Sequence, residues 1–200
     1  MPPKAKFTRE EILQAAFETA RIQGIDKITS RELGKRLGSS ARPIFTVYEN
    51  MDDLKQDVIG RARELYKQYV MDGLKKEPAF KGVGMAYIRF AIEEPLLFQL
   101  LFMNPQSSLT DVNSILPVID ASYEDILRSV QEPYGLNRET AKRFYQHLWT
   151  YSHGIAAMCA TKLCSYTMEE ISLRMTEIFK GLLFMEKSKE NSKGANHDKN

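Results

Sequence analysis

Three positions in the sequence carry the same signal for the start of an α-helix, a threonine followed three residues later by a glutamate. The pairs are Thr8 and Glu11, Thr29 and Glu32, and Thr167 and Glu170. In such a capping box the threonine oxygen accepts a hydrogen bond from an unpaired amide, and the glutamate reaches back to the cap. Each box is also flanked by two apolar residues, one just before the cap and one five residues later, which fix the path of the chain into the helix. These apolar pairs are Phe7 and Ile12, Ile28 and Leu33, and Tyr166 and Ile171.

Apolar residues recur at helical spacing along most of the chain, whereas the alternation typical of strands is scarce. We therefore predict an all-α fold of about nine helices. The predicted helices cover residues 9–23, 30–37, 40–48, 51–74, 80–93, 95–103, 115–131, 138–163 and 168–185. We expect residues 1–50 to form one domain, residues 51–186 a helical body, and the polar, lysine-rich residues 187–200 a disordered tail.

Residues 30–48 have the pattern of a helix-turn-helix motif, because Gly38 interrupts two short helices. When such a motif binds DNA, its second helix enters the major groove and presents its N-terminal residues to the base edges. In this chain those residues are Ala41, Arg42 and Pro43. Arg42 is the strongest candidate for reading a base, because a guanidinium matches the two acceptors of guanine. Thr46 lies one turn further on, where it can reach a base or a phosphate.

Charge and helix ends suggest further contacts to a DNA backbone. Thr29 and Ser30 open the first helix of the motif, where free amides suit a phosphate, and Lys4 and Lys6 precede the first helix of the chain, where they could follow the DNA backbone. The net charge is +2, and the residues up to Tyr48 hold nine basic and five acidic side chains, so this segment carries +4 and the remainder −2. A basic end on a slightly acidic body fits a DNA-binding protein. Helix pairs with a glycine turn also occur in proteins that never bind DNA, so the pattern alone leaves the function open.

The segment GSSARPIFTVYENMDDL, which begins at Gly38, resembles the signature of TetR-family transcriptional regulators. The signature has a glycine and serine turn, an aromatic residue on the recognition helix, a second aromatic residue three positions later, and a leucine early in the next helix. The upstream residues 8–37 fit this family as well. The resemblance implies a homodimeric repressor that binds operator DNA and is released by a small hydrophobic effector. It adds Ser40, Phe45, Tyr48 and Lys55 to the predicted DNA-binding residues.

Two positions depart from the family pattern. Phe45 stands where the family usually has a tyrosine, so a hydroxyl that contacts a phosphate is missing. Met51 stands where a lysine usually meets a phosphate, and Lys55 is expected to replace part of that contact. Tyr48 stands at a usual phenylalanine, where we expect the ring in the core and the hydroxyl at its rim.

The last two predicted helices carry more apolar residues than one buried face needs, so we expect each to be buried on two sides. One side would face its own subunit and the other a second copy, which gives a two-fold dimer, the arrangement that the resemblance also implies. Small residues that would allow close approach of helices are Gly154, Ala156, Ala157 and Ala160. A helix buried at the centre of a monomer is the alternative.

The segment between Trp149 and Gly154 resembles a pattern found in one subgroup of TetR-like C-terminal domains, in which inner helices surround an effector. We predict a mostly apolar pocket with a few polar groups. Its predicted residues are Tyr87, Phe90, Phe98, Gln99, Phe102, Met103, Trp149, His153 and Met158, with His147 as a further polar candidate. Ordinary core packing is the alternative for each of them.

The sequence offers no catalytic constellation, metal-binding spacing or cofactor motif, so we expect neither an enzyme nor a bound cofactor. Cys159 and Cys164 are five residues apart on a predicted helix, where a disulfide would require the helix to break. No apolar run long enough to span a membrane occurs, and we expect a cytoplasmic protein. Two alternatives remain, a TetR-like regulator that activates transcription or answers to a protein partner, and a helical small-molecule carrier or enzyme.

Overall fold

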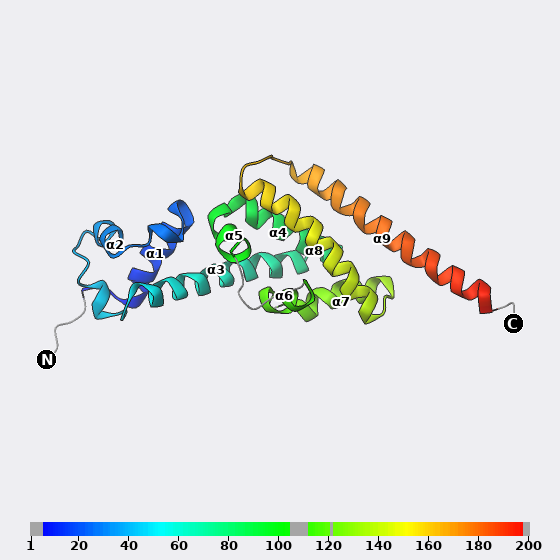
Figure 1. Cartoon of the computed structure of the whole chain (residues 1–200), viewed down its shortest axis with the longest axis horizontal. Coiled ribbons are helices and arrows are strands. Elements are labelled where there is room, and N and C mark those ends of the chain that lie inside the picture. The colour runs from blue at the N-terminus through cyan, green and yellow to red at the C-terminus, as the bar shows by residue number, and fades with distance from the viewer. Residues whose placement is uncertain (1–5, 105–111, 121, 198–200) are drawn as a thin grey trace.

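The computed structural model describes residues 6–104, 112–120 and 122–197 of the chain. Within these ranges the chain forms nine α-helices, two short 3-10 helices and no strand, which confirms the predicted all-α fold (Figure 1). The α-helices are α1 (Arg9–Gln23), α2 (Ser30–Arg36), α3 (Met51–Leu74), α4 (Ala79–Glu93), α5 (Pro95–Phe102), α6 (Val112–Ile119), α7 (Tyr123–Tyr134), α8 (Arg138–Ala160) and α9 (Met168–His197). None of these helices combines the length and the apolar character that crossing a lipid bilayer requires.

The N-terminal unit consists of α1, α2 and the 3-10 helices η1 (Ile25–Lys27) and η2 (Ile44–Thr46). The capping box of Thr8 is present, because its hydroxyl accepts from the amide of Glu11 at 3.2 Å and the Glu11 carboxylate accepts from its amide at 2.7 Å. At the start of α2 the hydroxyl of Thr29 likewise accepts from the amide of Glu32 at 3.2 Å. Local capping chemistry therefore sets both helix starts.

The predicted third helix from Ser40 to Tyr48 is wrong in type, because this segment consists of turns followed by η2. Most of its hydrogen bonds span three residues, as in the 3.2 Å bond from the amide of Phe45 to the carbonyl of Arg42. The amide and the hydroxyl of Thr46 both donate to the carbonyl of Pro43, at 3.3 and 2.7 Å. The amide of Val47 then donates to the carbonyl of Ile44 at 3.1 Å, and not to the carbonyl of Pro43 as an α-helix would require.

Helix α3 leaves the N-terminal unit and runs through the body, so it joins the two parts covalently (Figure 1). Its start matches the prediction: the side-chain oxygen of Asn50 accepts from the amides of Asp52 and Asp53 at 2.8 and 2.9 Å. Its C-terminal end crosses α4 at a pair of buried glycines. A β-carbon on Gly73 would lie 2.7 Å from the carbonyl oxygen of Gly82, so only glycine allows this close approach.

The predicted helix 115–131 is wrong in extent, because it is divided into α6 and α7. The division lies at Asp120, whose carboxylate accepts from the amide of Ser122 at 3.2 Å and from the hydroxyl of Tyr145 at 3.0 Å. A buried aspartate that is satisfied in this way holds a turn where the sequence pattern shows a continuous helix.

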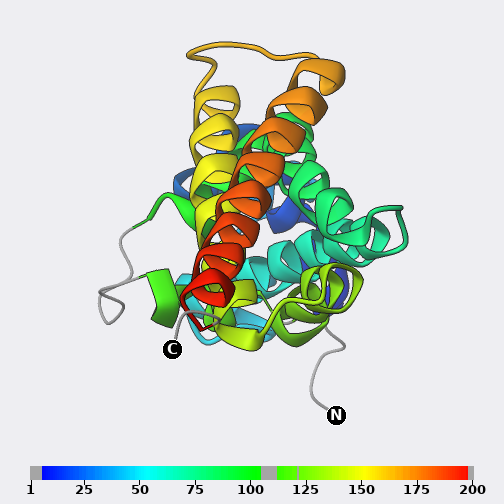
Figure 2. The same ribbon diagram turned by 90° about the vertical axis from the view of Figure 1, so that its right-hand side faces the viewer.

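Helix α9 lies beside α8 and continues far beyond the predicted end at Met185, so the expected disordered tail is wrong up to His197 (Figure 2). No proline follows Met185, and most residues from there to Asn191 are charged or polar helix formers. The ion pair between Lys189 and Glu186, at 3.8 Å and one helical turn apart, adds modest support.

Candidate nucleic-acid interface and ligand cavity

The segment after α2 presents one face to solvent and one to the core. Arg42 and Thr46 are exposed, and Phe45 is 48% exposed, a large fraction for an aromatic side chain. Ile44, between them in the sequence, is completely buried. The predicted contacts Ser40, Ala41 and Pro43 belong to the same surface segment, with Ser40 exposed and the other two half-buried. The segment from Ser40 to Thr46, which has one exposed face, is called the recognition edge below.

Tyr48 does not lie on the recognition edge, because its side chain is only 2% exposed. Its hydroxyl donates to the carboxylate of Asp57 on α3 at 3.0 Å, and Arg9 of α1 donates to the same carboxylate at 2.7 and 3.0 Å. The Arg9 guanidinium also lies 4.3 Å from the centre of the Tyr48 ring, within cation–π range. Burial and the hydrogen bond to Asp57 raise the pKa of Tyr48 to about 12. Tyr48 therefore holds the recognition edge against α1 and α3, with its ring in the core as predicted. Its direct contact with DNA stays a prediction, and its burial in this structure argues against it.

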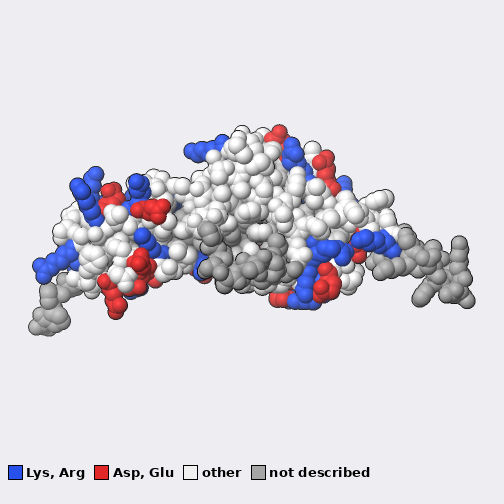
Figure 3. All heavy atoms as spheres, viewed as in Figure 1, with Lys and Arg blue, Asp and Glu red and all other residues white. Residues whose placement is uncertain are grey.

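Basic side chains lie on α2, which packs against the start of the recognition edge at Gly34. Arg31, Lys35 and Arg36 of α2 are exposed, and in the described ranges neither they nor Arg42 forms an ion pair with a carboxylate. The amine of Lys6 donates to the hydroxyl of Ser39 at 3.0 Å, just before the recognition edge. Figure 3 shows lysine and arginine side chains projecting from the outer end of the N-terminal unit. These unpaired cations are available to an anionic partner.

The other predicted phosphate contacts differ in their accessibility. Thr29 is exposed, whereas Ser30 and Lys55 are half-buried at the first turns of α2 and α3. Met51 is packed against the core, so it leaves the start of α3 without the cation that the family pattern has there. The sequence prediction also extended to Lys4, which lies outside the described residues.

Most of the predicted effector residues are brought together, but they are packed against one another. Tyr87, Phe98 and Phe102 form mutual ring contacts with centroids 5.1–5.4 Å apart. Trp149 is stacked on His153 at 5.0 Å, and the hydroxyl of Tyr87 is hydrogen-bonded to Nδ1 of His153 at 2.8 Å. Burial lowers the pKa of His153, which favours its neutral form. Further contacts to Tyr66 involve Phe90 and Phe102, so the rings form one continuous aromatic cluster.

Four candidate effector residues stand apart from the aromatic cluster. The side-chain amide of Gln99 donates to the carbonyl of Ala160 at 2.8 Å, which ties α5 to the end of α8. Met103 is 42% exposed, and Met158 is packed at the edge of the core. His147 is exposed on the outer face of α8. A free space of only about 30 Å³, room for one water molecule, lies between the aromatic cluster and Asp120.

Asp120 is a buried acid that sequence reasoning did not single out. Burial raises the pKa of its carboxyl group, although hydrogen bonds from the Ser122 amide and the Tyr145 hydroxyl counteract part of that rise. Trp149 lines the same small space, and in the described part of the chain its buried indole nitrogen has no hydrogen-bond partner. The only sequence signal for this buried acid was a single aspartate within an otherwise apolar helical pattern.

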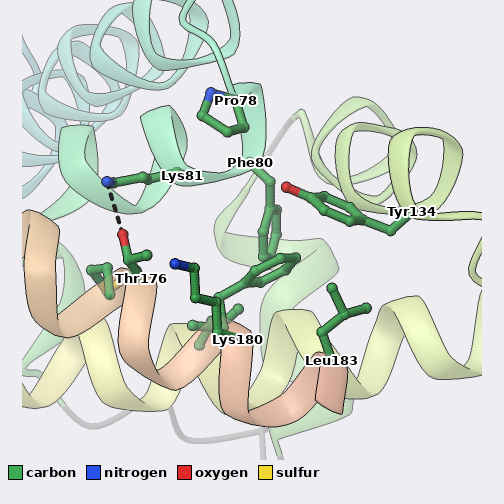
Figure 4. A pocket seen from close by; sticks show the side chains of 10 residues that line it. Pro78, Phe80, Lys81, Tyr134, Thr176, Lys180 and Leu183 are labelled. Atoms are coloured by element: carbon green, nitrogen blue, oxygen red, sulfur yellow. Dashed lines mark hydrogen bonds between the residues drawn. The ribbon is translucent and has the colours of Figure 1, made fainter. Parts of the chain in front are cut away.

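A mostly apolar cavity with a volume of about 310 Å³ lies elsewhere, between α4, α7, α8 and α9 (Figure 4). It is lined by Pro78, Phe80, Lys81, Tyr134, Leu148, Met175, Thr176, Phe179, Lys180 and Leu183. Sequence reasoning missed this cavity, since the apolar residues of the last helix were expected to pack against the subunit and a second copy, and neither lysine was singled out.

The outer faces of α8 and α9 remain uncovered in the single chain. Ala156 and Ala160, two of the small residues predicted to meet a second copy, are instead buried inside the subunit. Gly154 is exposed and has open space above its Cα atom, and Ala157 is half-buried. A groove between the two helices is lined by Gln146, His147, Thr150, Tyr151, Ile178 and Leu182. On α9, Leu173, Phe184 and Met185 are 58–74% exposed.

The described residues contain no group of three or more histidine, cysteine, aspartate or glutamate side chains placed to hold a metal ion. Comparison with known proteins gave no matching family model and no matching curated protein.

Proposed function

We propose that this chain is a sequence-specific DNA-binding transcriptional repressor that acts as a homodimer and releases its operator when a small effector binds. The observation that carries the proposal is the recognition edge, where Arg42, Phe45 and Thr46 face solvent while Ile44 and Tyr48 anchor the segment from behind. The unpaired arginines of α2 beside this edge supply the charge that binding to a phosphate backbone needs. The resemblance of residues 38–54 to the TetR signature supports the same function.

In the proposed mechanism the two recognition edges of a dimer enter successive major grooves, about 34–36 Å apart or at a multiple of that spacing. An effector that binds the free shape better than the DNA-bound shape shifts the population away from DNA. Helix α3 transmits the change of shape from the body to the N-terminal unit, because it starts directly behind the recognition edge and ends in the body. A transcriptional activator, or a regulator that is controlled by a protein partner, would bind DNA through the same recognition edge.

The first experiment is a gel-shift assay on the DNA upstream of the chain's own gene, across a series of salt concentrations. Binding that weakens steeply with salt is expected, because phosphate contacts release counterions. The cavity of about 310 Å³ would equally serve a helical small-molecule carrier. A carrier would bind no DNA at any salt concentration, so the absence of DNA binding would favour the carrier function over the repressor function.

Arg42→Ala is expected to weaken operator binding by about 1–3 kcal/mol and to relax base preference at one position of each half-site. The measurement is fluorescence anisotropy with a set of operators that carry single base changes. Arg128→Ala on α7 is the matched control, because this exposed arginine lies outside the N-terminal unit and pairs only with surface acids. Uniform weakening on every sequence would instead assign Arg42 to a phosphate.

The proposed dimer uses the outer faces of α8 and α9. Gly154→Arg should weaken dimerisation at least tenfold, because a second subunit packed on α8 would bury an unpaired charge. The variant should still fold, since the position is open in the single chain. Gly60→Arg, at an equally open glycine of α3, is the control and should leave the mass unchanged in light scattering. A wild-type chain that is monomeric at micromolar concentration would refute the dimer.

A further inference from the structure

The cavity between α4 and α9 has two chemically different ends. Figure 4 shows the amino groups of Lys81 and Lys180 at one end and Leu183 at the other. Lys180 is exposed and Lys81 is half-buried, so the basic end meets solvent. The walls between them are apolar and deeply buried, with Phe80, Leu148 and Met175 at most 8% exposed.

The two lysines are not neutralised by the protein. The amine of Lys81 donates to the hydroxyl of Thr176 at 2.9 Å, which leaves its positive charge uncompensated. Neither Lys81 nor Lys180 pairs with a carboxylate within the described ranges, and no acidic residue lines the cavity. Elsewhere α9 does neutralise its charges, as where Glu186 pairs with Lys189 at 3.8 Å. Two unpaired ammonium groups at the mouth of an apolar cavity favour an anion that carries an apolar tail.

We propose that this cavity binds a small anionic amphiphile, a carboxylate with an unbranched apolar chain of medium length. The carboxylate accepts hydrogen bonds from Lys81 and Lys180, and the chain lies between Phe80, Phe179 and Leu148 and extends toward Leu183. The volume of about 310 Å³ is at the lower limit of ordinary ligand pockets, which suits a medium chain better than a large ring system. The site is separate from the aromatic cluster around Tyr87 and His153, and its occupation requires no DNA.

Isothermal titration calorimetry of the full chain tests the proposal, with decanoate, octanoate, decanol and decyltrimethylammonium as probes below their micellar concentrations. Decanoate is expected to bind saturably at one site per chain. Octanoate should bind about tenfold more weakly, because two methylene groups fewer are removed from water. Decanol should bind more weakly than decanoate, and decyltrimethylammonium should not bind, because its charge has the sign of the two lysines.

Lys81→Gln/Lys180→Gln should weaken decanoate roughly tenfold to a hundredfold and leave decanol unchanged, since only the charge-assisted hydrogen bonds are lost. Lys67→Gln, an exposed lysine of α3 outside the cavity, is the matched control and should bind decanoate as the wild type does. Leu183→Trp tests the apolar part independently, because the indole would fill the cavity and abolish binding of both decanoate and decanol. Thermal unfolding without ligand shows that each variant is folded.

The proposal is overturned if decanoate does not bind the wild-type chain, if the double lysine variant binds it with unchanged affinity, or if the cationic probe binds as well as decanoate. Because the assay contains no DNA, a chain that fails to bind its upstream DNA can still bind decanoate. The reverse result, DNA binding without decanoate binding, would remove this site and leave the proposed repressor intact.

Discussion

Gly82→Ala is expected to lower the free energy of unfolding by about 2–3 kcal/mol, the upper part of the usual range for overpacking a core. A β-carbon at this position would clash with the carbonyl oxygen of Gly73 and lie 2.8 Å from the β-carbon of Lys76. The obstacle is backbone, which cannot move aside as a flexible side chain can, so α3 and α4 would have to separate. For a chain of this size the expected fall in Tm is roughly 4–12 °C.

Gly60→Ala is the matched control for this prediction. Gly60 is also helical, but a β-carbon there would meet nothing within 4 Å. Alanine should therefore stabilise α3 by up to about 1 kcal/mol through its higher helix propensity. Thermal and urea unfolding, followed by circular dichroism, measure both variants. Equal stability of the two alanine variants would show that the crossing of α3 and α4 is looser than the glycine pair indicates.

The helix starts could be predicted because capping is local. Asn50 and Asn137 hold the first amides of α3 and α8, and Thr167 exchanges both capping hydrogen bonds with Glu170 at the start of α9. Each of these contacts spans at most three residues, so the residues that determine it lie side by side in the sequence.

The errors arose where a distant residue or a missing stop signal decides the structure. The turn at Asp120 depends on Tyr145, which lies 25 positions later in the chain. The end of α9 has no proline or early glycine to mark it, so composition suggested disorder where the helix continues. The segment after Ser40 follows from the chemistry of Pro43 and Thr46, which a helical pattern alone does not reveal.

The two candidate sites differ in whether they are formed by neighbouring residues or by residues far apart in the sequence. The recognition edge lies within one short segment, and sequence reasoning identified its exposed members Arg42, Phe45 and Thr46. The ligand cavity depends on how α9 lies over α4, which places Lys81 beside Thr176 although 95 positions separate them. Sequence periodicity could show that both helices are amphipathic, but it could not show which parts of them meet.

Arg21→Met is expected to destabilise the chain by about 2 kcal/mol, because it leaves the carboxylate of Glu94 buried without its partner. Arg21 of α1 donates through Nε to Glu94 at 2.6 Å and through a second nitrogen to the other carboxylate oxygen. The side chain of Glu94, between α4 and α5, is only 3% exposed, whereas that of Arg21 is 43% exposed. Loss of one partner from a fully buried pair costs more, roughly 3–5 kcal/mol, and solvent access to Arg21 reduces the expected loss.

The double variant Arg21→Met/Glu94→Met separates the ion pair from the packing of the two side chains. With both charges replaced by apolar groups, the free energy of unfolding should return to within about 1 kcal/mol of the wild-type value. Arg128→Met is the control, because its ion pairs on α7 are exposed and should contribute at most about 1 kcal/mol. A double variant no more stable than Arg21→Met would mean that packing, and not the buried charge, accounts for the loss.

The same pair connects the N-terminal unit to the body, because Arg21 lies on α1 and Glu94 at the junction of α4 and α5. Its loss should therefore loosen the attachment of the two parts as well as lower global stability. Hydrogen exchange of the Arg21→Met variant should speed up more in α1 than in α8, and the double variant should restore the protection of α1. Uniform acceleration along the whole chain would show that the pair contributes to stability without holding the recognition edge in a fixed relation to the body.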